Sequence, residues 1–241
     1  MPIEVYKPIG MTPLEIVEDY KQKNNIKKAC FAGRLDPMAH GVMKLLINDE
    51  CKLLDTYCAK EKIYEFKVLF GFETDTYDVL GKVIKTKNIS KLEKIDWSKY
   101  LGEIEQPYPP YSSIVINKKS LWEWAKLDLL DTIIIPSKKV NISYIEELEN
   151  NESYDMLSLK KTIFSMIESL DSKNKTKFRV DEIMKCWNSV FSGIPVENKP
   201  IIKKFRAKVS SGTYIRSLAH NIGKDLETGA IALDIKRTEI L

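Results

Sequence analysis

The sequence is poor in the residues that build metal centres and covalent cross-links. Its 241 residues include two histidines and four cysteines, and no two cysteines form a Cys-x-x-Cys pair. Structural zinc sites and disulfide frameworks need closely spaced Cys and His ligands or regularly placed cysteines. We therefore expect neither kind of site, and reduced thiols in a cytosolic setting.

Long apolar runs are missing as well. No stretch approaches the roughly twenty residues that span a bilayer, and the N-terminus lacks the charged-then-apolar order of a signal peptide. We expect a soluble cytoplasmic protein with no membrane contact. Its length and its 44% share of hydrophobic residues favour one large globular domain or two small ones.

Arginine is scarce, which draws attention to the few positions where it occurs. The basic residues number 38, and five of them are arginines: Arg34, Arg179, Arg206, Arg216 and Arg237. A guanidinium differs from an ammonium in offering a planar fork of donors, so these positions are candidates for specific contacts. The net charge of +4 permits a polyanionic partner without requiring one.

Apolar periodicity predicts both strands and helices. Thr12, Pro13 and Glu15 form a helix start with a capping box. Residues 64–72 and 205–209 alternate as strands do, with a polar loop expected at 73–78 and the beginning of a partner strand at 81–84. Residues 156–170 and 183–191 carry apolar side chains at helical spacing, with a polar linker at 173–177 between the two amphipathic helices.

The first candidate for chemistry is Asp36. It lies in Gly33-Arg34-Leu35-Asp36-Pro37, where glycine and proline favour a loop that displays the carboxylate. The alternative is a purely structural role, in which Asp36 opens an Asp-Pro turn. Downstream, Ser211 to Arg216 follows the strand at 205–209 and opens a helix, which makes Arg216 either a bidentate partner for a carboxylate or a surface ion pair.

These segments, with four others, resemble the TruB family of RNA pseudouridine synthases, which act on the T-loop of tRNA. The motifs occur in the family's order through the whole chain: Lys7-Pro8-Ile9-Gly10-Met11-Thr12, Gly33 to Pro37 with Gly41, Lys62-Ile63-Tyr64, Thr74-Asp75-Thr76-Tyr77-Asp78 with Gly81, Pro109 to Ser113 with 121–126, and Ser211 to Leu218 with Lys236-Arg237-Thr238. The resemblance implies a single α+β catalytic domain over residues 1–241. Its mixed, largely antiparallel sheet is flanked by helices and crossed by the active-site cleft.

The resemblance also implies a mechanism. Asp36 is expected to attack the ribose of a flipped uridine, as nucleophile or base, with Arg216 as its ion-pair partner. Tyr64 is expected to stack on the extruded base and to take part in proton transfer, although it could equally be a core tyrosine of its strand. Tyr214 is a second stacking platform. No metal or organic cofactor is implied, so we expect none.

Other residues are expected to support the pocket or contact RNA. We expect Asp75 to order the active-site loop, Lys7 to support the pocket floor and Arg237 to contact phosphate. Arg34 is expected to meet RNA beside Asp36.

Residues 111–126 resemble the mobile segment by which the family grips RNA. Lys118 and Lys119, interleaved with Trp122 and Trp124, suit that use.

The chain departs from the family's pattern in three places. Phe31 stands where the family usually has a histidine, and it is expected either to stack on RNA or to join the core. The chain stops just past Thr238, so we expect no C-terminal PUA-type domain and a lower affinity for tRNA. Residues 151–200 look like a helical insertion, which we expect to dock RNA or a partner in place of that domain.

Two rival functions remain open from the sequence. The first is an RNA-binding or tRNA-folding protein with weak or no catalysis, and the second is a pseudouridine synthase that acts on another RNA loop. A protein-binding module fits less well, because it would not need Asp36, Tyr64 and Arg216 together. We expect a monomer.

Overall fold

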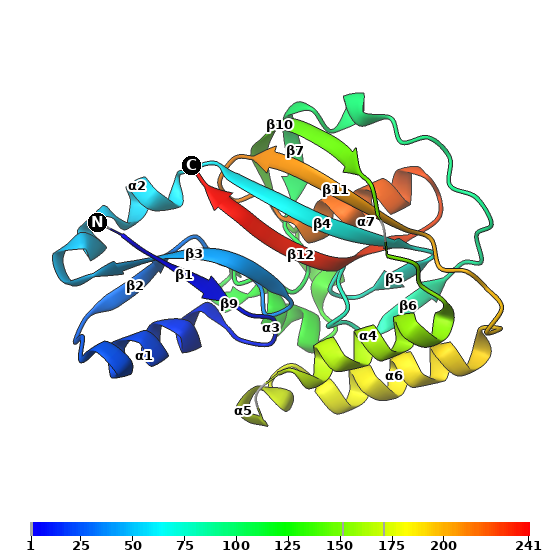
Figure 1. Cartoon of the computed structure of the whole chain (residues 1–241), viewed down its shortest axis with the longest axis horizontal. Helices are drawn as coiled ribbons and strands as arrows, with labels where there is room; N and C mark the ends of the chain where they lie inside the picture. The colour runs from blue at the N-terminus through cyan, green and yellow to red at the C-terminus, as the bar shows by residue number, and fades with distance from the viewer. Residues whose placement is uncertain (1, 151, 171) are drawn as a thin grey trace.

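One extended sheet runs through the molecule (Figure 1). The computed structural model describes residues 2–150, 152–170 and 172–241. Within them the strand order is β1-β3-β12-β4-β11-β10-β7, with β2 pairing with β3 from off this path. These strands are β1 (Ile3–Lys7), β2 (Ala29–Ala32), β3 (Ala39–Ile47), β4 (Lys62–Phe70), β7 (Gly102–Pro107), β10 (Ser137–Leu148), β11 (Ile202–Val209) and β12 (Ala230–Ile240).

The pairings of this sheet are antiparallel except for that of β12 with β3, which is parallel. Short hairpins and helices fill the connections. The hairpins pair β5 (Phe72–Thr74) with β6 (Val83–Thr86) and β8 (Val115–Ile116) with β9 (Lys119–Ser120). The helices are α1 (Pro13–Asn24), α2 (Leu54–Cys58), α3 (Leu121–Lys126), α4 (Met156–Glu168), α5 (Ser172–Lys175), α6 (Val180–Gly193) and α7 (Ile215–Asp225), with 3-10 turns at Asn48–Leu53, Trp97–Lys99 and Leu130–Thr132. The α+β architecture expected from the sequence is confirmed.

The sheet has apolar packing on both faces. On one face, alternate residues of β4, β11 and β12 pack against α7. On the other, Leu69, Ile231 and Leu233 pack against α4 and α6, which run beside each other below one end of the sheet (Figure 1). A third cluster joins α1 to β1 and β3. Consecutive residues of β12 therefore serve different cores, as alternation along a strand requires.

Most of the elements expected from periodicity are present. The helix α1 begins after Thr12, whose capping box with Glu15 is complete, and both amphipathic helices form as α4 and α6. Part of the expected polar linker is the short helix α5. Asn151 and Asp171, which fall in the expected insertion, lie outside the described residues.

The strand expected over 64–72 is interrupted. β4 ends at Phe70, and Gly71 adopts a positive φ of 87° before β5 begins. That left-handed conformation is open to glycine at low cost and turns the chain out of the main sheet. The expected polar loop accordingly starts after Thr74 rather than at Glu73, and the expected partner strand forms two residues later, as β6.

Candidate functional site

Asp36 lies on the loop between β2 and β3. Gly33, with φ of 79°, starts the loop, and the amide of Ala39 donates to the Asp36 carbonyl at 3.0 Å to close a turn. The adjacent segment is tied in by the Gly10 amide, which donates to the Pro37 carbonyl at 2.9 Å. The Asp36 side chain keeps 28% of its surface exposed. The loop therefore displays this carboxylate, as the sequence predicted.

Two wholly buried cations hold this loop from beneath. The Lys7 ammonium donates to the carbonyls of Met11 (2.7 Å), Pro8 (2.9 Å) and Pro37 (3.3 Å), and burial lowers the pKa of Lys7 to about 8. The Arg237 guanidinium donates to the carbonyls of Val42 (2.7 Å), Gly33 (3.2 Å) and Arg34 (3.4 Å). Buried cations of this kind are tolerable because backbone oxygens satisfy their donors. Lys7 thus lies beneath the loop that carries Asp36.

The phosphate contact expected of Arg237 does not fit its position. Arg237 lies against the smaller cavity, but its side chain has no exposed surface and its donors are directed at the backbone of β3 and of the Asp36 loop. A guanidinium without solvent access cannot meet an RNA phosphate without leaving those carbonyls unsatisfied. Arg237 is a positioning residue for the loop.

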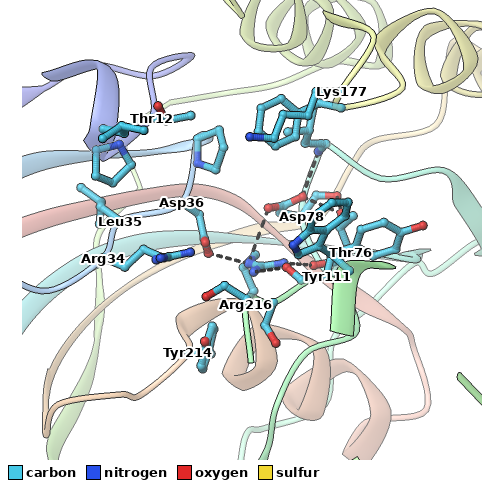
Figure 2. A pocket seen from close by; sticks show the side chains of 18 of the residues that line it. Thr12, Arg34, Leu35, Asp36, Thr76, Asp78, Tyr111, Lys177, Tyr214 and Arg216 are labelled. Atoms are coloured by element: carbon cyan, nitrogen blue, oxygen red, sulfur yellow. Dashed lines mark hydrogen bonds and ion pairs between the residues drawn. The ribbon is translucent and has the colours of Figure 1, made fainter. Parts of the chain in front are cut away.

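Arg216 brings four segments together. It is the second residue of α7 and its side chain is 4% exposed. Its Nε donates to the Asp36 carboxylate at 2.7 Å, Nη1 to the Thr76 carbonyl at 2.6 Å and Nη2 to the Tyr111 carbonyl at 3.3 Å (Figure 2). The ion pair expected between Asp36 and Arg216 is present, but it uses one nitrogen instead of a bidentate fork, because the other two serve the backbone.

Sequence reasoning did not single out Asp78, which approaches the same guanidinium. Its carboxylate lies 3.7 Å from Arg216 Nε, accepts from the Thr76 hydroxyl at 2.6 Å and from the Leu80 amide at 3.0 Å. Burial raises the pKa of Asp78 to about 6, although Arg216 acts in the opposite direction. Burial alone would lower the pKa of Arg216, but Asp36 and Asp78 outweigh it and raise that pKa. The guanidinium is a fixed positive charge between two carboxylates.

Two cavities meet at Asp36. One has a volume of about 330 Å³ and the other about 220 Å³, and both are lined by Arg34, Leu35, Asp36 and Tyr214. Asp36 therefore lines both cavities, with Arg216 on the larger one and Tyr64 on the smaller one.

Phe31 lies between the core and the larger cavity. It is half-buried against the cluster of α1, β1 and β3, and it also lines the larger cavity. Tyr64 likewise is a buried strand residue, 7% exposed, that lines a cavity. Each of these two aromatic residues therefore packs in the core and also lines a cavity.

Other candidates lie outside the cavities. Asp75 pairs through its carboxylate with Arg179 (2.8 Å) and accepts from the Lys82 amide (2.9 Å), so it joins loop 75–82 to the start of α6. Lys118 is in the turn of the β8–β9 hairpin, with φ of 68°, and Lys119 Nζ is 5.0 Å from the centre of the Trp124 ring. Both lysines are exposed on the segment that leads into α3.

Arg179 is a second residue that sequence reasoning missed. It lies in the expected insertion yet lines the larger cavity, with its guanidinium carbon 4.3 Å from the centre of the Tyr111 ring. The scarcity of arginine was the available signal, but the fold was needed to bring residue 179 beside residue 111.

The described residues contain no group of three or more His, Cys, Asp or Glu side chains placed to hold a metal ion. The four cysteines are free. No described helix is both long and apolar enough to cross a membrane.

The fold defines a class of proteins that includes chains of known solved structures. A chain of a Cbf5-Nop10-Gar1 complex shares the fold with a TM-score of 0.56 at 20% identity, over 99% of this chain and 48% of that one. An H/ACA RNP bound to a substrate RNA containing 2'-deoxyuridine shares it with a TM-score of 0.53 at 21% identity, over 99% of this chain and 47% of the other. These likenesses concern the fold alone.

The sequence comparison identifies the family to which the chain belongs. The model of the N-terminal domain of TruB family pseudouridylate synthases matches residues 21–163, so the chain belongs to the TruB family. Similar relatives include the tRNA pseudouridine synthase B of Aquifex aeolicus (32% identical, 97% of this chain, 66% of the relative) and that of Clostridium tetani (30%, 98% and 66%). The chain spans about two thirds of the length of these relatives.

Proposed function

We propose that this protein is a tRNA pseudouridine synthase that isomerises a flipped uridine of the T-loop, with Asp36 as the nucleophile. The observation that carries the proposal is the contact between the cavity-facing Asp36 carboxylate and the buried Arg216 guanidinium at 2.7 Å. Membership of the TruB family, and relatives named tRNA pseudouridine synthase B, support the reaction and the substrate.

The proposed reaction is an isomerisation and needs no other reactant. The Asp36 carboxylate attacks the ribose carbon C1′, and the bond from C1′ to N1 breaks with its electron pair leaving on the uracil. The uracil turns within the cavity so that C5 faces C1′, a new carbon–carbon bond forms and the carboxylate is released. The proton lost from C5 balances the one gained at N1. Atoms and charge are conserved, so the proposed reaction consumes no second reactant.

Arg216 supports this role of Asp36 electrostatically. An attacking carboxylate must be ionised, and a guanidinium fixed by two backbone carbonyls favours the charged form and restricts its orientation. Because Arg216 is nearly fully buried, the interaction is screened less than a surface ion pair. Asp78 balances part of the charge of Arg216, which leaves Asp36 free to break its contact during attack.

Tyr64 and Tyr214 are proposed as the faces that receive the extruded base. Both line the 220 Å³ cavity beside Asp36, and Tyr214 is further held by an edge contact with Tyr108 at 5.8 Å between ring centres. Stacking on aromatic rings offsets the few kcal/mol that unstacking a base costs. We propose that one chain suffices, because all of these groups come from the same chain.

The test is to incubate the protein with an unmodified tRNA transcript and to map pseudouridine at single-nucleotide resolution. Wild type should convert the T-loop uridine, and Asp36→Ala should yield none while binding the transcript. A matched control is Asp234→Asn, since Asp234 pairs with His40 away from both cavities.

Three results would contradict the proposal in different ways. Tight binding without product from wild type would favour an RNA-binding protein. Product only in another RNA loop would change the target. Product from Asp36→Ala would remove Asp36 from the chemistry.

A further inference from the structure

The tip of the helical insertion reaches the larger cavity. Lys177, Phe178 and Arg179 immediately precede α6, and all three line the same space as Asp36. Figure 2 shows Lys177 across the pocket from Tyr214. A segment between two surface helices has no need to end at an active-site cavity, so its position there calls for a functional explanation.

The insertion is firmly anchored beside the cavity. On α6, Trp187 is fully buried and its indole N–H donates to the Val79 carbonyl at 3.1 Å. In α5, the Asn174 amide donates to the Glu15 carboxylate of α1 at 2.7 Å. Arg179 adds its ion pair to Asp75. The tip is therefore fixed to the same elements that frame the cavity.

Cations outnumber carboxylates at this tip. Lys126, at the end of α3, donates to the Lys177 carbonyl at 2.7 Å, which brings its ammonium close to the tip. Burial, Arg179 and Lys177 lower the pKa of Lys126, and they outweigh Glu182, which acts in the opposite direction. Of the nearby carboxylates, Asp75 is paired with Arg179, and Glu182 is paired with Lys82 at 2.7 Å. Such mutual repulsion is relieved when an anion binds.

Aromatic rings alternate with these cations. Lys126 Nζ lies 5.2 Å from the centre of the Trp122 ring and Lys177 Nζ lies 5.6 Å from that of Phe178. Trp122 and Phe178 line the cavity as well. Interleaved cations and aromatic faces suit a nucleic acid strand, whose phosphates and bases alternate in the same way, better than a compact anion.

We propose that Lys177 of the insertion, together with Lys126 of α3, binds the phosphodiester backbone of the RNA next to the nucleotide that enters the cavity. The identity of the RNA in this proposal rests on the proposed function, whereas the contact of the two lysines with phosphate does not. It assigns the insertion a substrate-binding role through one exposed side chain at its tip.

The test compares Lys177→Ala with Lys185→Ala for binding of a tRNA transcript over a range of salt concentrations. Lys185 is an exposed lysine of the same insertion and lines neither cavity. Each lost phosphate contact should reduce the slope of log K against log[salt] by about 0.7–0.9 and weaken binding about threefold or more. Lys177→Ala should show both changes, Lys177→Arg should restore them and Lys185→Ala should match wild type.

The outcomes separate this proposal from the proposed function. Pseudouridine formation by wild type, with identical salt slopes for wild type and Lys177→Ala, would overturn the inference alone. Binding that depends on Lys177, with no pseudouridine from wild type, would overturn the function and keep the inference. No binding of the transcript by wild type would overturn the inference too. Thermal melting of each variant checks that the exposed substitution leaves the fold intact.

Discussion

Two sets of cations lie around the cavities, and they differ in how they are held. The floor cations, Lys7, Arg216 and Arg237, are buried and donate to backbone carbonyls. The rim cations, Lys119, Lys126 and Lys177, are exposed and lie over the aromatic rings of Trp124, Trp122 and Phe178. The floor cations are fixed in place before any ligand arrives. The rim cations are exposed side chains, and the Lys126 ammonium also donates to the Lys177 carbonyl.

This difference indicates that the floor cations position the backbone of the site, whereas the rim cations are available to bind a ligand. A buried cation cannot exchange its carbonyl acceptors for a phosphate without leaving them unsatisfied, which costs about 1–3 kcal/mol for each group. A lysine ammonium that lies over an aromatic ring loses little interaction free energy when it moves to bind a phosphate. Substitutions in the floor should therefore change stability and catalysis together, whereas those in the rim should change RNA affinity alone.

The largest effect is expected from Arg216→Ala. Removing the guanidinium leaves Asp78 buried without its cation and releases the carbonyls of Thr76 and Tyr111. Loss of one partner from a buried pair costs about 3–5 kcal/mol. The free energy of unfolding, measured by urea titration, should fall by that amount, and the rate of pseudouridine formation should fall at least about 10²-fold.

Arg206→Ala is the matched control for that substitution. Its side chain is 41% exposed and pairs with Glu65 at 2.6 Å on β4. Surface pairs of this kind contribute about 0–1 kcal/mol. Equal losses of stability in Arg216→Ala and Arg206→Ala would break the distinction between buried and exposed cations.

A smaller, pH-dependent effect is expected from Asp78. Because burial raises its pKa to about 6, the folded state favours the protonated form. The stabilisation is present in full below the unfolded value near 4 and is lost as the pH rises through 6. Between pH 4 and pH 7, wild type should therefore lose about 2–3 kcal/mol of unfolding free energy relative to Asp78→Asn.

Urea titrations of both chains at pH 4, 5, 6 and 7 measure that difference. Glu182→Gln serves as the control, because Glu182 is exposed and its pKa is lowered by its hydrogen bond to Lys82. Stability curves of wild type and Asp78→Asn that run parallel over this range would show that burial does not govern Asp78.

The sequence predicted the elements whose periodicity is simple. The helices α4 and α6 each bury one face, so their apolar spacing is clear. β12 was missed because Ala230 to Leu233 are all buried, two on each face, and a continuous apolar run does not show the alternation of a strand. The predicted strand is interrupted at Gly71 because this residue adopts a positive φ, which the alternation of the sequence does not show.

At the site, the motifs located Asp36 and Arg216, which are 180 residues apart in the chain and in contact in the fold. The burial of charged side chains was harder to predict from the sequence. Charged side chains are mostly exposed in proteins, so no pattern in the sequence indicates that Arg237 is enclosed or that Asp78 shares Arg216 with Asp36. Both outcomes depend on which carbonyls and carboxylates the fold brings around each residue.

The smallest effect is expected at the far end of the rim. Lys119 lines neither cavity, and its ammonium lies 5.0 Å from the centre of the Trp124 ring. Lys119→Ala should leave the free energy of unfolding within about 0.5 kcal/mol of wild type. If RNA passes along residues 115–126, its affinity should fall about twofold to threefold with a shallower salt slope. Affinity unchanged by Lys119→Ala but reduced by Lys177→Ala would confine RNA to the cavity's edge, whereas a loss of stability would show that the rim, like the floor, holds the fold together.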